Sequence, residues 1–139
     1  MSPLPQEPFL LDFDKIGDKS TGYIVTTQKA DLLPFAVRRV FWTFGTPVGV
    51  ERGGHANKTM EELLVAVQGT VQVRLHTVQD QHYKFILDSP SQGLYVPPLS
   101  WIIVRCDEAS VLLSLASTDF EEEDYMRDFA DFGARISGK

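Results

Sequence analysis

The sequence predicts an all-β fold, a closed barrel or jelly roll, with one short helix near its C-terminal end. Short runs rich in β-branched and aromatic residues recur along the chain, and turn residues separate them. Helical periodicity is nearly absent before residue 117, so a parallel α/β fold lacks its crossover helices. A chain of 139 residues, 43% of them hydrophobic, suits one core. We therefore expect a single domain over 1–139.

The expected strands cover about residues 9–117. The first, at 9–13, follows a proline-containing start that favours irregular or edge structure, because proline cannot donate to a strand ladder. Further strands are expected at 22–27, 37–44, 63–67, 70–75, 83–87, 93–96, 101–105 and 110–115, with another around residue 55. Gln68-Gly69 predicts a tight hairpin turn between two of them.

The last segment predicts a helix over about 119–134. Ser117 or Thr118 can cap its N-terminus, and four acidic residues at 121–124 suit the positive end of a helix dipole. Aromatic residues then recur at intervals of four and three, at Tyr125, Phe129 and Phe132. We expect this aromatic stripe to pack against the barrel.

Charge and cysteine content exclude several functions. The formal net charge of −6 argues against general binding to nucleic acid or to an anionic membrane surface. No apolar run approaches the ~20 residues that a membrane span requires. The single cysteine, Cys106, cannot form an internal disulfide, which suits a reducing compartment. We expect a soluble, cytoplasmic protein whose anionic ligands meet a local cluster of cations.

The most informative stretch runs from Arg52 to Glu62 and contains His55 and Asn57. Residues two apart in a strand point to the same face, so both side chains can face the barrel interior. Metal-binding cupins place two histidines at this spacing, followed by a glutamate and a glycine. Here Asn57 replaces the second imidazole, and a divalent transition metal needs about three good protein ligands. We therefore expect no metal.

Without a metal, His55 is the obvious group for acid–base chemistry, because its ordinary pKa lies near neutral pH. The alternative is a buried histidine that only hydrogen-bonds to Glu62 or to a backbone carbonyl. Glycines at 53–54 allow close ligand approach, and nearby cations suit phosphates. The expected cations are Arg39, Arg52, Lys58 and Arg74.

Three blocks together carry a family resemblance. They are PFAVRRV at 34–40 leading to RGGHANK at 52–58, then the stretch 87–101 with LYVPP and Trp101, and finally LAS at 115–117 with EDYMR at 123–127. In these blocks the sequence resembles the sugar 3,4-ketoisomerases of the WxcM-like cupin family. The resemblance implies a jelly-roll (cupin, double-stranded β-helix) barrel.

The resemblance also implies a function. Such enzymes move the keto group of dTDP-4-keto-6-deoxyglucose from C4 to C3 without metal or cofactor, in deoxyamino-sugar and surface-polysaccharide synthesis. His55 and Asn57 stand at the two motif histidines, with Arg52 and Lys58 as flanking cations. Tyr95 and Trp101 join Arg39 and Arg74 as expected contacts of the nucleotide sugar. A homodimer with exchanged N-terminal strands is implied as well.

The sequence departs from the family pattern at four positions: Thr21, Phe41, Asn57 and Ile102. Three interpretations remain. The chain isomerises the sugar with His55 as the sole base and Asn57 as an oxyanion donor; it acts on a different nucleotide sugar; or it binds one without turnover. A metal-dependent cupin dioxygenase or isomerase is a less favoured alternative, and the acidic charge makes a DNA-binding role the least favoured.

Overall fold

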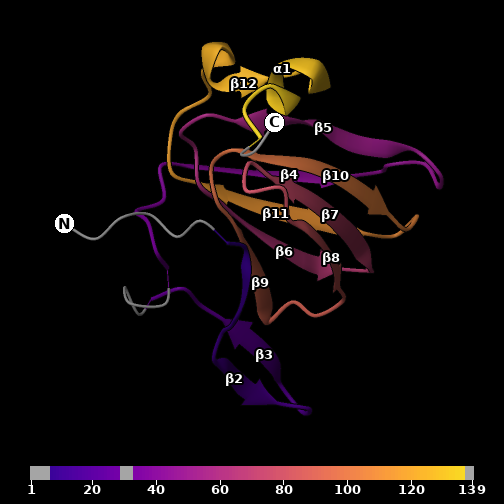
Figure 1. Ribbon diagram of the computed structural model, residues 1–139. Coiled ribbons are helices and arrows are strands. Elements are labelled where there is room, and N and C mark those ends of the chain that lie inside the picture. Colours follow the sequence, from indigo (N-terminus) through magenta and orange to yellow (C-terminus); the bar gives the residue numbers. More distant parts are fainter. Residues whose placement is uncertain (1–6, 29–32, 137–139) are drawn as a thin grey trace.

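Two five-stranded antiparallel sheets form the body of the molecule in a computed structural model, which describes residues 7–28 and 33–136 (Figure 1). The first sheet has the order β1-β9-β6-β11-β4, and the second has the order β12-β5-β10-β7-β8. The first sheet comprises β1 (Phe9–Asp12), β4 (Arg39–Phe44), β6 (Glu62–Gln68), β9 (Gln92–Val96) and β11 (Val111–Ala116). The second comprises β5 (Glu51–Asn57), β7 (Val71–Thr77), β8 (His82–Leu87), β10 (Ser100–Cys106) and β12 (Tyr125–Met126). This is the expected jelly roll of the cupin type.

The main core lies between the two sheets. Alternate residues of the strands face this core: Val71, Val73 and Leu75 on β7 are buried, and the residues between them are more exposed. These side chains pack against Leu64 and Leu94 of the opposite sheet. Burial of apolar side chains from both sheets therefore holds the barrel walls together.

The expected hairpin at Gln68-Gly69 is wrong. β6 pairs with β9 and β11, whereas β7 pairs with β8 and β10, so the turn carries the chain from one sheet to the other. Gly69 adopts a φ of +76°, and a Cβ atom there would lie 2.7 Å from the Ser110 Cα atom. The residues of a turn specify its local shape, but core packing decides which strands pair.

The N-terminal region adds a hairpin that projects from the barrel (Figure 1). Its strands, β2 (Lys15–Asp18) and β3 (Gly22–Val25), pair with each other and with no other strand of the residues that the structure describes. β3 lies within the strand expected at 22–27, whereas β2 was not predicted because Gly17 interrupts its apolar pattern. Thr21 lies in the tight turn of this hairpin and donates hydrogen bonds to Asp18.

The helix predicted over 119–134 is wrong in its extent. The segment forms a 3₁₀ turn, η2 (Glu122–Asp124), then β12, then one short helix, α1 (Phe129–Gly133). Asp128 caps α1 by accepting a hydrogen bond from the Ala130 N–H, whereas Ser117 accepts from the Glu61 N–H instead of capping a helix. Strand pairing of β12 with β5 overrides helix propensity in this segment.

The aromatic stripe divides accordingly. Phe132 is fully buried, Phe129 is half-exposed beside Trp101, and Tyr125 lies on β12.

Within the described ranges, no helix has the length and apolar character needed to cross a bilayer.

Candidate active site

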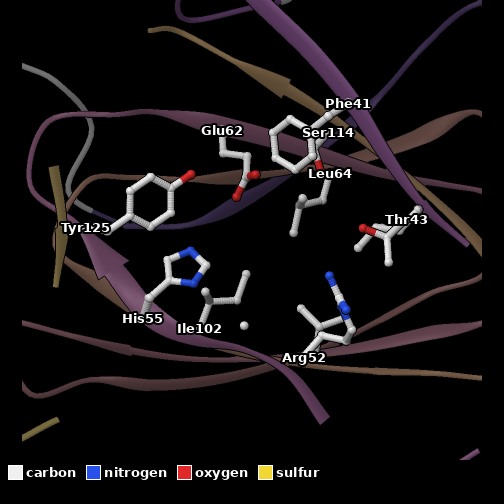
Figure 2. Close-up of a pocket in the computed structure, with 12 residues that line it drawn as sticks. Phe41, Thr43, Arg52, His55, Glu62, Leu64, Ile102, Ser114 and Tyr125 are labelled. Carbon is white, nitrogen blue, oxygen red and sulfur yellow. The ribbon is translucent and has the colours of Figure 1, made fainter. Parts of the chain in front are cut away.

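A pocket opens between the two sheets near the C-terminal segment. The empty space among its lining residues is about 560 Å³, part of which is open to solvent. Its lining residues come from β4, β5, β6, β10, β11 and β12: Phe41, Thr43, Arg52, Gly53, His55, Glu62, Leu64, Ile102, Val104, Leu112, Ser114 and Tyr125. Figure 2 draws these residues around the central space and labels most of them.

A β-bulge brings Arg52 and His55 to the same pocket. In a regular strand, residues three apart point to opposite faces. Here Ile102 of β10 pairs with His55 while Ile103 pairs with Gly53, which leaves Gly54 as an extra residue. Gly53 and Gly54 have φ values of +87° and +70°, and a Cβ atom on Gly53 would lie 2.6 Å from the Ile102 carbonyl oxygen. The two glycines thus permit the bulge, and the bulge places both side chains at the site.

His55 points into the pocket beside the ring of Tyr125 (Figure 2). The centroids of the two rings are 4.9 Å apart. Desolvation by burial lowers the pKa of His55 from its ordinary value, and the nearby Arg127 charge acts in the same direction. At neutral pH the imidazole is therefore uncharged and able to accept a proton.

Glu62 enters the same space from β6, opposite His55 (Figure 2). Burial raises the pKa of its carboxyl group to about 7, and the Arg39 charge offsets only part of this effect. The pocket thus combines a neutral imidazole with a carboxyl group that is half protonated near neutral pH. Titratable groups whose pKa values are perturbed by burial in a pocket are typical of proton-transfer sites.

Arg39 and the C-terminal segment build the wall behind these groups. The Arg39 Nη2 atom lies 3.1 Å from the Tyr125 hydroxyl oxygen and donates a hydrogen bond to it. Its guanidinium lies over the Phe41 ring, at 4.7 Å, and does not itself line the pocket. The Arg127 guanidinium lies over the Tyr125 ring, 4.6 Å from its centroid, and forms a two-bond ion pair with Glu122. Arg39 is thus a positioning residue in this chain.

Asn57 does not line the pocket, contrary to the expectation that its amide acts beside His55. Its Nδ2 atom donates to Asp124 at 3.2 Å. The same carboxylate accepts from the backbone N–H and the hydroxyl of Thr59 and from the Met60 N–H. Asn57 therefore helps to fix the segment that carries Tyr125.

Two other predicted residues lie away from the pocket. Lys58 is exposed, and its Nζ atom donates to the Glu123 carbonyl oxygen on the outside of the C-terminal segment. Tyr95 is fully buried in a second core on the outer side of the first sheet, where its ring stacks on Phe9. Its hydroxyl donates to Glu61 at 2.7 Å. Both residues serve packing or capping in this chain.

Arg74 and Trp101 lie on the opposite face of the second sheet. Ile102 of β10 faces the pocket, so its neighbour Trp101 faces outward. Arg74 is exposed there and pairs with Glu51 at 2.8 Å. The structure therefore does not bring these two residues to His55.

Sequence reasoning did not include Glu62 and Tyr125 among the site residues. An acidic residue followed directly by the apolar run 63–67 is the signal that a carboxyl group is buried, and burial is what raises its pKa. Tyr125 gave no such signal, because its position depends on the pairing of β12 with β5.

The fold and this pocket together define a cupin-like jelly-roll protein with a candidate active site between its two sheets. The chain matches the family model described as WxcM-like, C-terminal (FdtA), over residues 6–137. The chain belongs to this family, as its sequence resemblance predicted.

Named relatives agree with this assignment. The chain is 35% identical over 132 residues to a TDP-4-oxo-6-deoxy-alpha-D-glucose-3,4-oxoisomerase of Aneurinibacillus thermoaerophilus, covering 92% of this chain and 91% of that protein. It resembles the crystal structure of the sugar 3,4-ketoisomerase QdtA from Thermoanaerobacterium thermosaccharolyticum in complex with TDP, with a TM-score of 0.86, 31% identity and 93% of each chain covered. It also resembles WlaRA, a TDP-fucose-3,4-ketoisomerase from Campylobacter jejuni, with a TM-score of 0.85, 25% identity and coverage of 94% and 96%.

Proposed function

We propose that this protein is a TDP-sugar 3,4-ketoisomerase that moves the carbonyl of a 4-keto-6-deoxyhexose from C4 to C3. The observation that carries the proposal is the shared pocket of His55 and Glu62, whose pKa shifts suit a base and an acid at the same pH. The named activities of the relatives supply the reaction class.

The two groups account for each proton in the reaction. The neutral imidazole of His55 removes the proton from C3, which the adjacent C4 carbonyl makes acidic, while the neutral carboxyl group of Glu62 protonates O4. A neutral enediol results. The Glu62 carboxylate then takes the proton from the O3 hydroxyl as the His55 imidazolium returns a proton to C4. Both groups end in their starting states, and no cofactor or metal enters the cycle.

Arg52 is the cation that supports diphosphate binding at this pocket. Its side chain is exposed at the opposite end of the pocket from Tyr125 (Figure 2). A guanidinium group binds phosphate oxygens in a two-pronged geometry. The hexose would extend from there toward His55. The relative QdtA was solved in complex with TDP, which supports a TDP-linked ligand for this chain.

Binding without turnover is the second candidate function. It is favoured by Asn57, which stands at a motif histidine and is engaged by Asp124 instead of facing the pocket. In this case the protein holds a TDP-sugar, and neither His55 nor Glu62 exchanges protons with it.

An exchange experiment in deuterated water distinguishes the two functions. We expect the wild-type protein to introduce solvent deuterium into the sugar ring of TDP-4-keto-6-deoxyglucose, and NMR measures the rate. His55→Gln is expected to lower this rate at least about 100-fold. Ser114→Ala, which also changes a polar pocket residue but removes no proton-transfer group, serves as the matched control and is expected to retain activity. Both candidate functions predict that TDP stabilises the native state against thermal unfolding. Deuterium incorporation at the wild-type rate in His55→Gln would reject His55 as the base.

A homodimer completes the proposal. The β2–β3 hairpin pairs only with itself and exposes Ile16 and Ile24, and an isolated two-stranded hairpin is marginally stable. The outer face of edge strand β4 exposes Trp42 and Phe44. Exchange of the hairpin between two copies would cover apolar surface on both.

The TDP-sugar substrate and the free thiol of Cys106 suit a cytoplasmic location.

A further inference from the structure

A second cluster of reactive side chains lies on the β7–β8 hairpin, outside the pocket. His76, Asp80 and His82 place one possible ligand atom each within 4.8 Å of one another. The His76 Nε2 atom lies 2.8 Å from the Asp80 Oδ1 atom, and the two imidazole rings stack with centroids 3.9 Å apart. The proposed ketoisomerase chemistry uses none of these groups.

The hairpin geometry brings the three residues together. His76 and His82 are directly opposite each other in the antiparallel pairing of β7 and β8. Asp80 lies in the connecting turn with a φ of +62°, and its N–H donates to the Thr77 carbonyl oxygen. The turn thus directs the carboxylate back toward the histidines.

Neighbouring aromatic rings pack against His76, whereas His82 and Asp80 face solvent. The His76 side chain is only 16% exposed, because it packs against the rings of Phe129 and Phe132. His82 and Asp80 are more exposed. The cluster borders an outer groove that Trp101 and Arg74 also line. A small ion can therefore enter from solvent, while His76 is held in place.

We propose that His76, Asp80 and His82 bind a first-row divalent transition-metal ion, with Zn²⁺ the best match. Two imidazoles and one carboxylate form a ligand set that suits Zn²⁺, Co²⁺ and Ni²⁺. The metal would replace the hydrogen bond between His76 and Asp80, and rotation of the exposed His82 ring would supply the third ligand. A fourth position stays open to water. The ligands differ from Mg²⁺ and Ca²⁺ sites, which use oxygen.

The site is independent of the ketoisomerase pocket. Trp101 pairs with His76 and faces the groove, whereas Ile102 faces the pocket, so β10 separates the two. Metal binding at this cluster therefore does not depend on the proposed ketoisomerase activity.

Titration calorimetry of the untagged protein with zinc chloride tests the inference. The chain contains three histidines, so the His55→Gln protein retains only the two in the cluster and is a matched control. We expect one Zn²⁺ per chain, with affinity lowered at least about tenfold in His82→Gln and in Asp80→Asn but unchanged in His55→Gln. His82 is exposed, so this variant is expected to fold normally, which circular dichroism checks.

A second readout locates the metal. Bound Ni²⁺ is expected to quench Trp101 fluorescence saturably in a Trp42→Phe background and not after the added His82→Gln change. Co²⁺ is expected to give visible absorption bands that His82→Gln removes. Absence of stoichiometric Zn²⁺ binding, equal binding by His82→Gln, or loss of binding in His55→Gln would each overturn the proposal.

Discussion

Burial changes what the carboxyl group of Glu62 can do. In water a glutamate is ionised at neutral pH, but in this pocket desolvation raises its pKa to about 7. The same environment lowers the pKa of His55, because each group loses the stabilisation of its charged form. Opposite shifts from one cause leave the imidazole uncharged and the carboxyl group half protonated near neutral pH, so that both groups can exchange protons.

The raised pKa also predicts a pH dependence of stability. The folded protein binds the Glu62 proton more tightly than the unfolded chain, so raising the pH from 4.5 to about 7 favours unfolding. This contribution to the free energy of unfolding is lost across that window and amounts to about 3 kcal/mol. Urea unfolding of Glu62→Gln is expected to show a correspondingly smaller decrease in stability between about pH 4 and about pH 8, a range that spans both pKa values of Glu62. Parallel pH profiles for the two proteins would contradict the assignment.

At the scale of an element, the bulge in β5 is the feature on which the site depends. It turns a strand with alternating faces into one that presents both Arg52 and His55 to the pocket. The antiparallel partner β10 fixes the bulge, because the backbone of Ile102 leaves no room for a side chain at Gly53. A local exception to strand geometry thus creates the candidate active site.

Alanine substitutions at the two bulge glycines test this dependence. Both positions have positive φ, which costs alanine about 1–2 kcal/mol, but only at Gly53 would the new Cβ atom contact backbone. We expect Gly53→Ala to lower the free energy of unfolding by more than about 2 kcal/mol and to impair activity. Gly54→Ala is expected to lower it only by the cost of positive φ, about 1–2 kcal/mol. Thermal unfolding and the deuterium-exchange assay measure both effects. Equal losses at the two positions would show that contact with β10 is unimportant.

The C-terminal segment is a second element that serves the site. Its 3₁₀ turn, short strand and short helix place Tyr125 over His55, and Asp124 holds it through four hydrogen bonds. At the end of the barrel away from the β2–β3 hairpin, this segment closes one side of the pocket (Figure 1).

At the scale of the whole molecule, the distribution of exposed apolar side chains is uneven. Trp42 is 59% exposed and Phe44 70% exposed on the outer face of β4, and Ile24 is 65% exposed on the projecting hairpin. Large apolar side chains exposed on an edge strand and on a projecting hairpin favour a protein interface. The proposed homodimer would bury them.

Light scattering after size-exclusion chromatography tests the dimer. We expect the mass of two chains for the wild type and a shift toward one chain for Trp42→Glu, because a buried unpaired charge opposes association. Ile86→Glu is the matched control: Ile86 is 47% exposed on β8 of the other sheet, and this change is expected to leave the mass unaltered. A wild-type mass of one chain would reject the dimer.

Local pattern sufficed to predict much of this protein. Alternating apolar residues and turn residues predicted an all-β closed barrel or jelly roll and most of its strands, because side-chain period and backbone preference act within a few residues. The motif around His55 and two further blocks predicted the family.

Contacts between distant segments settled the rest. The Gln68-Gly69 turn, the extent of the C-terminal helix, and the separation of Trp101 and Arg74 from His55 all depend on which strands pair and which face of a sheet is covered. Arg52 joins His55 through a bulge formed against β10, and Glu62 acquires its pKa from burial between two sheets. Short-range propensity carries no information on such pairings, because their energy arises only when residues far apart in the chain meet.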